Sequence, residues 1–533
     1  MMFRKYPVGI QSFETIRRDG YMYVDKTPLI YKMISEGKPY FLSRPRRFGK
    51  SLLCSTLAAV FEGRRELFEA FTTDDGVEQP QLFIATTNWR WEKHPVFRFD
   101  FSSGDIRTIE QLDVLIDDML SGYEQKYGIT SSISDVNIRM KHLLRLSHEQ
   151  AGRRAVVIVD EYDNFILHSI GDKEKTDLAR QRFQNLFGPL KEMDDHLQFV
   201  FVTGISKFSQ MGIFSKLNQL NNISMTGEYD SICGISEEEL TTQLRPDIEQ
   251  MAEKAGKEYN EMLAELKQMY DGYHFSEALT DIYNPFSIVN ALNSYKLRDY
   301  WFSSGTSSAL INMLAQMPNI DIAQMDGIRM PSTAFDLPLE SFDDPLPVLY
   351  QSGYITIKDY QPERRMFTLG FPNGEVRTGF ADCLYQHVTR SKPSDYNRSV
   401  FLDAYYDFRD NNDLPTFMEA VKTFFASVPY HLDNGNEHHY HALLYTLLTA
   451  FGADVLAEEP TAKGRADIVL RMPTTIYVME IKYDGSAKDA LEQIDKKGYA
   501  KKYSLDGRSV VNVGMSFSGQ ERNITEWVTK YAI

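Results

Sequence analysis

Cysteine is scarce in this chain, with only Cys54, Cys233 and Cys383 among 533 residues. The three lie far apart and form no C-x-x-C pair, which excludes a disulfide framework and a cysteine-based zinc cluster. A run of about 20 apolar residues, as a membrane-spanning helix requires, is also lacking. The N-terminal stretch "MMFRKYPVGIQSF" has no long apolar segment of the kind found in secretory signals. We therefore expect a cytoplasmic protein without membrane association.

An excess of positive charge is absent as well. The formal net charge is -16, which argues against a protein that coats nucleic acid in general but leaves room for a local basic groove. The chain is too long for one compact core, so we expect two to four domains. We find neither an internal repeat nor a low-complexity tract.

Three regions differ in their patterns. In residues 1–225, short apolar runs alternate with helical patterns, which is typical of a parallel α/β sheet. Residues 226–375 are mainly helical and include one hairpin pattern. In residues 376–533, helical patterns precede two strands and a further helix, and a polar, turn-rich stretch lies near the boundary. The segments that carry these patterns are 39–43, 95–101, 155–163, 197–204, 354–360, 366–371, 390–399, 466–470 and 475–483.

The stretch "FLSRPRRFGKSLL" contains most of a phosphate-binding loop. Gly49, Lys50 and Ser51 match the end of G-x-x-x-x-G-K-[ST], whereas Arg44 stands where the first glycine belongs. In such a loop, backbone N–H groups surround phosphates at a helix N-terminus. Lys50 would reach the outer phosphates, and the Ser51 hydroxyl would bind Mg²⁺. A strand pattern before the loop and a helical pattern after it fit this interpretation.

The rest of the loop leaves two interpretations open. Arg44, Arg46 and Arg47 crowd around Phe48 and the G-K-S residues, which indicates an anion site in an otherwise acidic chain. Arg44 must manage without the positive φ that a glycine would allow. The alternative is that G-K-S simply begins a surface helix.

The strand pattern "AVVIVDEYD" favours the nucleotide interpretation. Its apolar residues predict a buried parallel strand, and Asp160 and Glu161 follow at its carboxyl end. A carboxylate at this position holds Mg²⁺ in P-loop ATPases. We predict that Asp160 coordinates the metal and that Glu161 orients or deprotonates the attacking water. A strand that ends in solvated acids is the less favoured alternative.

A further strand pattern, "LQFVFVTGISKFS", ends in polar residues. Thr203 could sense the terminal phosphate of the nucleotide, and Lys207 could add positive charge during phosphoryl transfer. A turn of Thr and Gly without a ligand remains the alternative.

These motifs, together with "PVGIQSFETIRRDGYMYVDKT" (7–27) and the phrases "YDGYHF", "YNPFSIVNAL", "YWFSSGT" and "LYQSGYITI", resemble the AAA-ATPase-like proteins common in gut Bacteroidetes. The likeness covers nearly the whole chain, and R-R-F-G-K-S is the usual loop in that family. It implies ATP binding by a P-loop domain, followed by a helical lid with a winged-helix-like end. For Asp25, Lys26 and Thr27 we favour helix capping over contact with the nucleotide.

A second set of charged residues lies near the C-terminus. Glu480 and Lys482 are two apart on a strand pattern and therefore share a face, and Asp467 precedes them on the neighbouring strand pattern. Two carboxylates, with the Ile481 carbonyl, could bind Mg²⁺, and Lys482 could position a water or stabilise charge on the scissile phosphate. The alternative is an edge-strand salt bridge.

The spacing D-x(12)-E-x-K resembles the metal site of the PD-(D/E)xK nuclease superfamily, with Ala466 in place of the proline. This resemblance implies a restriction-endonuclease-like α/β domain, in which Glu437 could supply another acid and Gln493 could join the site. A tyrosine expected four residues after Gln493 is instead Lys497, and Tyr499 follows, which weakens the match. Lys496, Lys497, Lys501 and Lys502 form either a basic patch or a solvated helix face. We interpret His438, His439 and His441 as surface or packing residues.

Taken together, the sequence predicts an α/β multidomain protein with a P-loop parallel sheet (1–225), a helical, winged-helix-like middle (226–375) and a nuclease-like domain (376–533). ATP and Mg²⁺ are the expected cofactors. The expected function is ATP-regulated cleavage of nucleic acid, with DNA favoured over RNA and an oligomer allowed. The alternatives are a nucleotide-gated binding or signalling protein with an inactive nuclease fold, and a scaffold.

Overall fold

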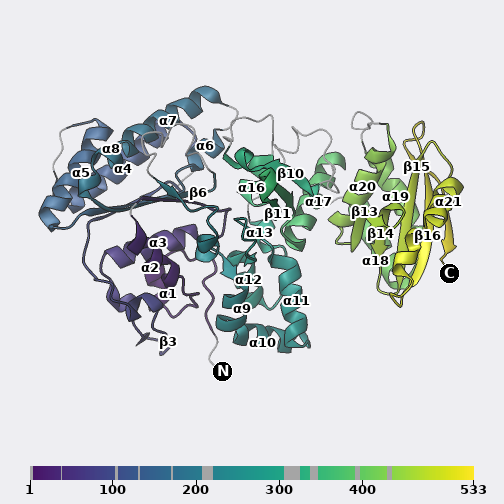
Figure 1. Ribbon diagram of the computed structural model, residues 1–533, viewed down its shortest axis with the longest axis horizontal. Coiled ribbons are helices and arrows are strands. Elements are labelled where there is room, and N and C mark those ends of the chain that lie inside the picture. The colour runs from purple at the N-terminus through teal and green to yellow at the C-terminus, as the bar shows by residue number, and fades with distance from the viewer. Residues whose placement is uncertain are drawn as a thin grey trace. The chain divides into compact units, whose positions relative to one another are not determined.

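The computed structural model describes residues 4–37, 39–102, 106–129, 133–169, 172–206, 220–304, 325–336, 346–389, 396–428 and 435–532. The chain forms two compact units that interleave in sequence. The first unit comprises residues 1–301 and 329–373, and the second comprises 302–328 and 374–533 (Figure 1). The finer three-part division expected from the sequence stays a prediction.

The first unit is built on a sheet of five parallel strands in the order β4-β5-β6-β1-β7. Every residue of β5 is buried, as its unbroken apolar sequence predicts for a strand covered on both faces. Figure 1 shows α4, α5, α7 and α8 on one side of this sheet and α1, α2 and α3 on the other. The strands are β1 (Pro39–Ser43), β4 (Val96–Asp100), β5 (Ala155–Asp160), β6 (Leu197–Gly204) and β7 (Asn221–Asn222). The helices are α1 (Phe13–Arg18), α2 (Thr27–Glu36), α3 (Lys50–Phe61), α4 (Ile109–Lys126), α5 (Val136–Ala151), α6 (Asn164–His168), α7 (Lys173–Phe187) and α8 (Pro189–Glu192).

The strand order places the phosphate loop. The chain runs from β1 to the far edge at β4, returns through β5 and β6 to pair with β1, and then adds β7 on the other side of β1. In open α/β sheets, ligands bind outside the carboxyl ends of the strands where the order reverses. The loop after β1 and the acids after β5 lie at this edge, with β6 between them.

A helical region follows within the first unit. Helices α9 to α12 share one apolar core, to which Leu240, Ile248, Leu266 and Ile288 contribute. Ser236 and Glu239 form a reciprocal capping box that fixes the start of α9. The predicted hairpin is present as β11 and β12, joined by β10 into a three-stranded sheet. The elements are α9 (Glu237–Gln243), α10 (Arg245–Ala255), α11 (Tyr259–Tyr270), α12 (Pro285–Ser294), β10 (Ile328–Pro331), α16 (Leu346–Ser352), β11 (Thr356–Gln361) and β12 (Met366–Gly370).

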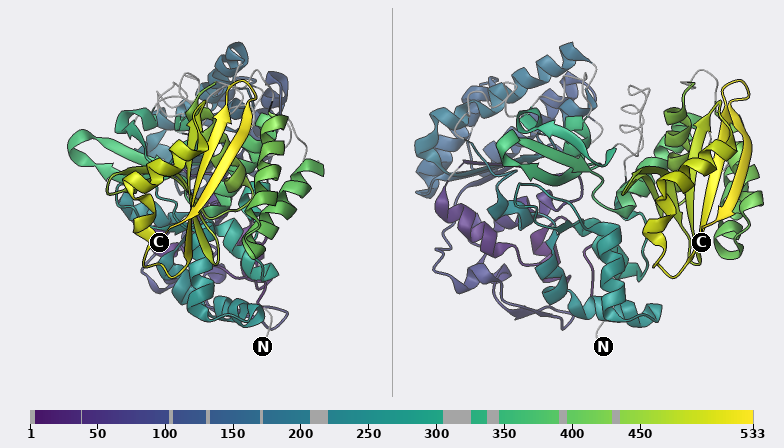
Figure 2. Two further views of the ribbon diagram at one scale, coloured as in Figure 1. Left: turned by 90° about the vertical axis from the view of Figure 1, so that its right-hand side faces the viewer. Right: turned by 45° about the vertical axis from the view of Figure 1, so that its right-hand side comes forward.

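The second unit contains a mixed sheet in the order β13-β14-β15-β16-β17. Only β15 and β16 run parallel, and α21 makes the crossover between them. Figure 2 shows α21 on one side of this sheet and the other helices on the opposite side. The elements are α17 (Gly374–Thr389), α18 (Tyr396–Asn411), α19 (Leu414–Ser427), α20 (Glu437–Ala450), β13 (Val455–Thr461), β14 (Gly464–Arg471), β15 (Thr475–Tyr483), α21 (Ala487–Lys497), β16 (Ser509–Ser518) and β17 (Asn523–Tyr531).

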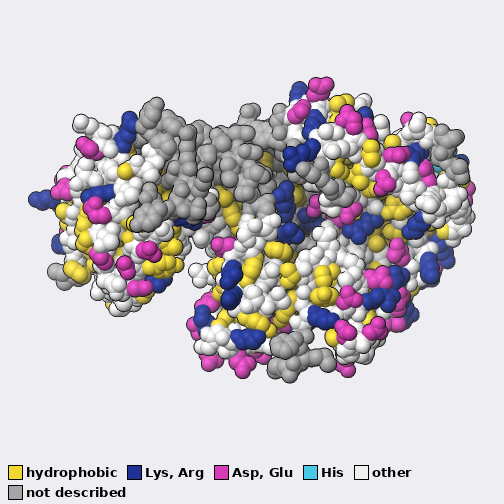
Figure 3. Space-filling view, turned by 180° about the vertical axis from the view of Figure 1, so that it is seen from behind, with side chains coloured by type: hydrophobic (Ala, Val, Ile, Leu, Met, Phe, Trp, Pro, Cys, Tyr) yellow, Lys and Arg dark blue, Asp and Glu magenta, His cyan; other side chains and the backbone are white. Residues whose placement is uncertain are grey.

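The three cysteines are free and buried. Within the described ranges, none of the helices combines the length and the apolar character needed to span a bilayer. On the face shown in Figure 3, basic and acidic side chains are intermixed. The acidic excess of the chain therefore does not form a one-sign surface on this face.

Candidate nucleotide site and candidate metal centre

The phosphate loop connects β1 to α3. Gly49 has φ 92° at the N-cap of α3, a left-handed conformation that favours glycine. The Lys50 ammonium donates hydrogen bonds of 3.0 Å to the backbone carbonyls of both Arg44 and Pro45, at the start of the loop. Lys50 and Ser51 are both buried. The predicted lysine and serine therefore lie beneath the loop, at the N-terminus of a 12-residue helix.

Arg44 is not part of an anion-binding ring of arginines, contrary to the sequence-based expectation. Its side chain is only 1 % exposed. It donates to the carbonyls of Ser224 at 2.8 Å and Tyr229 at 3.1 Å. The guanidinium carbon lies 4.1 Å from the centre of the Phe275 ring. The large residue that replaces glycine therefore fixes the loop against the following region of the first unit, because both of its terminal nitrogens bind these backbone carbonyls.

The remaining loop residues divide into buried and exposed positions. Phe48 is buried and packs edge-on against the rings of Tyr273 and Phe275, so its backbone and not its ring would face a nucleotide. Arg46 and Arg47 are exposed. Trp301 Nε1 donates a hydrogen bond of 2.9 Å to the carbonyl of Arg46. Arg46 and Arg47 thus remain the arginines of the loop that a phosphate could reach.

Asp160 ends β5 and is fully buried. Neither carboxylate oxygen makes a hydrogen bond of good geometry with the described residues, and Arg98 Nη2 lies 3.6 Å from Oδ2. Burial raises the pKa of Asp160 to about 6, although the nearby Ser51 hydroxyl and Lys50 ammonium act in the opposite direction. A buried carboxylate beside the G-K-S residues whose oxygens make no hydrogen bond of good geometry with the described residues fits a Mg²⁺ ligand, because a cation would supply the missing interaction.

The other polar residues at this edge have different surroundings. Glu161 is half-buried and adopts φ 49°, a left-handed conformation that a non-glycine residue rarely takes. Thr203 is fully buried, and its hydroxyl donates to the Leu42 carbonyl at 2.8 Å, which joins β6 to β1. Because this hydroxyl is already bonded, the predicted role of Thr203 as a phosphate sensor stays a prediction. Lys207 lies outside the described residues.

Sequence reasoning gave no role to Asp163. This carboxylate accepts hydrogen bonds from the Ile205 amide at 2.9 Å and from the Ser206 amide and hydroxyl at 2.6 Å each. It thereby ties the turn after β5 to the turn after β6. The signal was its place three residues after Asp160, at the carboxyl edge of the sheet.

Asp25 binds the first amide of α2, although the N-cap residue of that helix is Lys26, which makes no side-chain cap. One carboxylate oxygen of Asp25 accepts from the Thr27 amide at 2.8 Å, and the other accepts from the Phe83 amide at 2.8 Å. Lys26 is engaged with the Ser231 carbonyl and the Glu239 carboxylate. These contacts fix the start of α2.

In the second unit, Asp467 and Glu480 lie on paired antiparallel strands. The β14–β15 register pairs Ile468 with Met479, and one more step sets Asp467 opposite Glu480. Asp467 Oδ2 accepts from the Ile481 amide at 2.8 Å. The hairpin therefore brings the two predicted carboxylates together, as their spacing required.

The environment of Glu480 raises its proton affinity. The side chain is 1 % exposed, and its Oε2 atom has no hydrogen-bond partner among the described residues. Burial, followed by the charge of Asp467, raises the pKa of Glu480 to about 8, while Lys482 opposes this shift. Burial raises the pKa of Asp467 as well. Such a pair favours a bound cation, which would offset the mutual repulsion of the carboxylates.

Lys482 and Glu437 complete the charged cluster. Lys482 Nζ lies 3.6 Å from Glu480 Oε1 and 3.6 Å from Glu437 Oε1. Glu437, the first residue of α20, also accepts a 3.1 Å hydrogen bond from the Tyr483 amide. The acid expected from the helix before the strands is therefore at the site.

Gln493 lies at the site despite the imperfect spacing to a tyrosine. Its side-chain amide donates to Glu480 Oε1. The chain turns at Gly498, whose φ is 68°, into a 3₁₀ helix that begins with Tyr499. Burial and the nearby Glu480 carboxylate raise the pKa of Tyr499. Tyr499, and not Lys497, is therefore near Gln493 and Glu480.

His441 is buried beside the candidate metal site, which agrees with its interpretation as a packing residue. It is 3 % exposed, and its Nε2 lies 2.7 Å from the Asp467 carbonyl oxygen. It follows Glu437 by four residues on α20, so the two share a helix face. That spacing to Glu437, rather than to the other histidines, was the available signal. The ring holds the backbone that carries Asp467.

The donor set suits Mg²⁺ rather than a metal enclosed by protein ligands. No group of three or more His, Cys, Asp and Glu side chains in the described part of the chain forms a metal cage. Mg²⁺ is usually held by one or two carboxylates together with waters and substrate phosphates. Asp467, Glu480 and the Ile481 carbonyl fit this pattern. Lys496 is largely exposed and pairs with Glu492, which favours the solvated-helix interpretation of the lysines.

A parallel sheet with a phosphate loop and a buried acid on one unit, and a D…E-x-K cluster on a mixed sheet in the other, define an ATPase-like protein with a nuclease fold. Residues 7–214 match the family described as "Predicted AAA-ATPase", and residues 435–527 match the PD-(D/E)XK nuclease superfamily. The chain is 32% identical over 546 residues to an "Uncharacterized protein in vnfD 5'region" of Azotobacter chroococcum mcd 1, which covers 99% of both chains. The chain belongs to the AAA-ATPase-like family and carries a C-terminal PD-(D/E)XK nuclease superfamily domain.

Proposed function

We propose that the protein binds and hydrolyses ATP in its first unit and that this controls Mg²⁺-dependent cleavage of nucleic acid, preferentially DNA, by its second unit. The observation that carries the cleavage half is the convergence of Asp467, Glu480 and Lys482, with one buried oxygen of Glu480 unpaired. The observation that supports the ATPase half is the buried Asp160 carboxylate beside Lys50 and Ser51.

In the first unit, the loop amides and Lys50 would bind the phosphates of ATP. Ser51 and Asp160 would hold Mg²⁺, and the half-buried Glu161, which follows Asp160, would orient the attacking water. Asp163 would keep the turn after β6 in place while the terminal phosphoryl group leaves, because it binds the Ser206 amide and hydroxyl. The exposed Arg46 and Arg47 would add positive charge at the rim.

In the second unit, Asp467 and Glu480 would hold Mg²⁺, which when bound lowers the pKa of a water ligand and polarises the phosphate. Lys482 would position the attacking water and stabilise negative charge on the phosphate. In the reaction a water oxygen bonds to phosphorus, one P–O ester bond breaks, and the water proton ends on the leaving oxygen. Glu437 keeps Lys482 in place through the ion pair at 3.6 Å, and Gln493 orients Glu480.

The contact between Trp301 and the phosphate loop supports the coupling of the two activities. Trp301 Nε1 donates to the Arg46 carbonyl at 2.9 Å, and its ring packs against Tyr273 and Tyr354. The chain leaves the first unit between Trp301 and Phe302. A nucleotide that moves the Arg46 carbonyl would therefore move the residue from which the second unit begins.

A cleavage assay tests the proposal. Purified protein with Mg²⁺ should cut DNA in a manner that depends on ATP, and Glu480→Gln and Lys482→Met should each reduce the rate by at least a hundredfold. The exposed Lys496 supplies the matched control, since Lys496→Gln should cleave normally. Equal rates for wild type and Glu480→Gln would remove the nuclease assignment.

One observation favours a second candidate, a nucleotide-gated nucleic-acid-binding protein with an inactive nuclease fold. Glu480 has a pKa of about 8 in this environment and is already engaged by Gln493, so its protonated form competes with metal binding at neutral pH. Calorimetric titration with Mg²⁺ and Mn²⁺ distinguishes the two. Binding that disappears in Glu480→Gln supports the nuclease, whereas ATP hydrolysis without metal binding at Glu480 supports the second candidate.

A further inference from the structure

The second unit contains a cavity apart from the Asp467–Glu480 cluster. Its volume is about 320 Å³, at the lower end of the range for small-molecule pockets, which is about 300 to 1,000 Å³. It is lined by α18, by the residues just after α20, by the β14–β15 turn and by the residue before β16. Arg471 and Asp467 are four residues apart on β14, which corresponds to about 13 Å. A ligand in the cavity would therefore not occupy the metal site.

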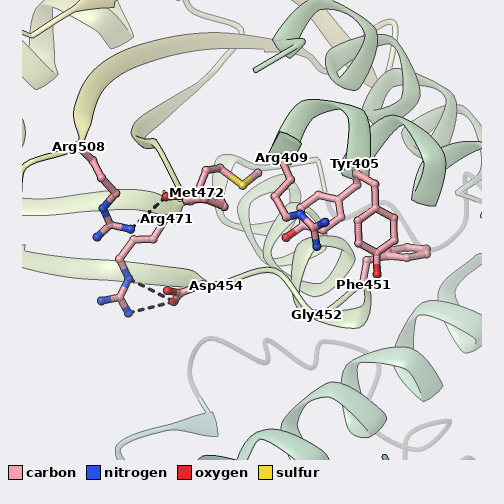
Figure 4. Close-up of a pocket in the computed structure, with 10 residues that line it drawn as sticks. Tyr405, Arg409, Phe451, Gly452, Asp454, Arg471, Met472 and Arg508 are labelled. Carbon is pink, nitrogen blue, oxygen red and sulfur yellow. Dashed lines mark hydrogen bonds and ion pairs between the residues drawn. The ribbon is translucent and has the colours of Figure 1, made fainter. Parts of the chain in front are cut away.

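Arginines from three separate elements line this cavity: Arg409, Arg471 and Arg508. Figure 4 shows Arg471 and Arg508 on one side and Arg409 with Tyr405 on the other. Asp454 is the acidic residue of the lining, and Asp410 and Asp506 pair with Arg409 and Arg508 next to it. An anionic ligand is therefore indicated by the guanidinium donors that these pairs leave open and not by net charge.

Each guanidinium is held in place by a carboxylate. Arg409 Nε donates to Asp410 at 2.7 Å, Arg471 Nη2 lies 3.0 Å from Asp454, and Arg508 Nε donates to Asp506 at 2.5 Å. Arg508 Nη1 donates to the Met472 carbonyl at 3.1 Å.

These contacts leave the Nη1 groups of Arg409 and Arg471 without a partner among the residues that the structure describes. A carboxylate that fixes one edge of a guanidinium presents the other edge for a phosphate at little conformational cost. Partly exposed ion pairs contribute little to stability. Stability alone therefore does not account for three such pairs around one cavity.

Aromatic rings lie beside the arginines. Tyr405 and Phe451 line the cavity with Tyr406, whose side chain is 41% exposed. The Arg409 guanidinium carbon lies 4.5 Å from the centre of the Tyr406 ring. Aromatic rings next to arginines form the platform on which proteins stack bases of single strands, with the phosphates on the basic groups.

We propose that this cavity binds one nucleotide unit, with its phosphate on Arg409 and Arg471 and its base on the tyrosine rings. The unit is either a free mononucleotide or one residue of a single strand that also reaches the metal site. The inference rests on the proposed function in taking nucleic acid as the ligand class. It goes beyond that function by assigning a second binding site on the same unit.

The test measures binding without cleavage. The full chain is titrated in EDTA with a fluorescein-labelled oligothymidylate of about ten nucleotides, and anisotropy gives the affinity at several salt concentrations. The double variant Arg409→Gln, Arg471→Gln should bind about tenfold more weakly, and its salt dependence should fall by about one or two ion equivalents. The matched control is Arg465→Gln, an exposed arginine paired with Glu458 at the other end of β14, which should bind as wild type does.

Two further measurements complete the test. Tyr406→Ala removes an exposed ring without touching an ion pair and should weaken binding about tenfold. Competition with thymidine monophosphate separates the sources: displacement of the probe supports a free nucleotide, and no displacement supports a residue within a strand. Unchanged affinity and salt dependence in a double variant that melts like wild type, or unchanged affinity in Tyr406→Ala, would overturn the proposal.

The same measurements distinguish a failure of this binding site from a failure of the proposed nuclease activity. Loss of all cleavage, with binding that still depends on Arg409 and Arg471, would remove the nuclease assignment and leave this site. Cleavage that depends on Asp467 and Glu480, together with oligonucleotide binding that does not depend on Arg409 and Arg471, would remove this site and leave the nuclease assignment.

Discussion

The guanidinium carbon of Arg44 lies 4.1 Å above the Phe275 ring, which joins the first position of the phosphate loop to a segment 231 residues later in the chain. A glycine at this position would free the backbone but could not make this contact. Arg44 also donates hydrogen bonds to three backbone carbonyls, those of Ser43, Ser224 and Tyr229. The phosphate loop is therefore held in place from one side by the buried guanidinium of Arg44.

The first prediction concerns Arg44. Arg44→Gly restores the common loop pattern, yet we expect it to destabilise the first unit by about 2–4 kcal/mol, because buried carbonyls lose their donors. ATP affinity should fall about tenfold as the loop loosens. Thermal melting and nucleotide titration measure the two effects. The control is Arg90, which is exposed and lies outside the phosphate loop. Arg90→Gly should change neither quantity. A more stable Arg44→Gly variant would contradict the prediction.

The second prediction concerns Trp301. Because its indole N–H donates to the loop carbonyl of Arg46, ATP binding should change its fluorescence. Trp301→Phe retains an aromatic ring but removes the donor, so this component of the signal should vanish, and DNA cleavage should lose most of its dependence on ATP. Trp527→Phe, in β17 of the second unit, should leave the response intact. A full fluorescence response in Trp301→Phe would show that Trp301 does not respond to nucleotide binding at the phosphate loop.

The third prediction is a pH dependence. Asp271 is 2% exposed, and burial raises its pKa from 3.8 to about 6 despite Lys267 nearby. Above pH 6 the folded protein holds an unfavourable buried charge, which corresponds to about 3 kcal/mol. This cost shrinks as the pH falls through 6 and vanishes below about 4, where the folded and unfolded states are both protonated.

Asp271→Asn should therefore melt at a higher temperature than wild type at pH 7.5, and the advantage should disappear by about pH 4. Melting curves across this range provide the measurement, and Asp74→Asn on the exposed surface should show no such trend. An advantage that persists unchanged at pH 4 would mean that burial of the charge is not its cause.

The fourth prediction concerns the packing of α21, the helix that carries Gln493, against strand β16. A Cβ atom at Gly514 of β16 would lie 2.1 Å from the Ala487 carbonyl oxygen and 2.7 Å from the Leu491 amide. Gly514→Ala should therefore push α21 away from the sheet, with a loss of about 2–3 kcal/mol and reduced cleavage. In Gly122→Ala, where a Cβ meets no atom within 4 Å in a helix, stability should rise slightly. Normal melting and activity in Gly514→Ala would show that the helix can shift without cost.

The sequence located the residues whose positions follow from the strand pattern. Lys50 follows a buried parallel strand and Asp160 ends another, and the carboxyl ends of parallel strands lie at one edge of the sheet. Asp467 and Glu480 met because a short turn joins their strands and fixes the register. In both cases the strand pattern sufficed to predict the strand ends, although for Lys50 and Asp160 the order of the strands comes from the structure, which places β6 between β1 and β5.

The contacts that sequence reasoning missed depend on distant segments or on a change of helical geometry. Nothing near Arg44 in sequence indicates Phe275, so the arginine looked like an anion ligand. Thr203 looked available at a strand end, but its hydroxyl was used by the neighbouring strand. Tyr499 reached the site only because the chain leaves the α-helix at Gly498.

The two compact units alternate along the chain. Residues 302–328 belong with 374–533, and residues 329–373 belong to the first unit. A fragment that starts at residue 374 would lack residues 302–328 of its own unit, and one that ends at residue 301 would lack residues 329–373 of the other. Isolating either whole unit therefore takes more than one cut in the chain.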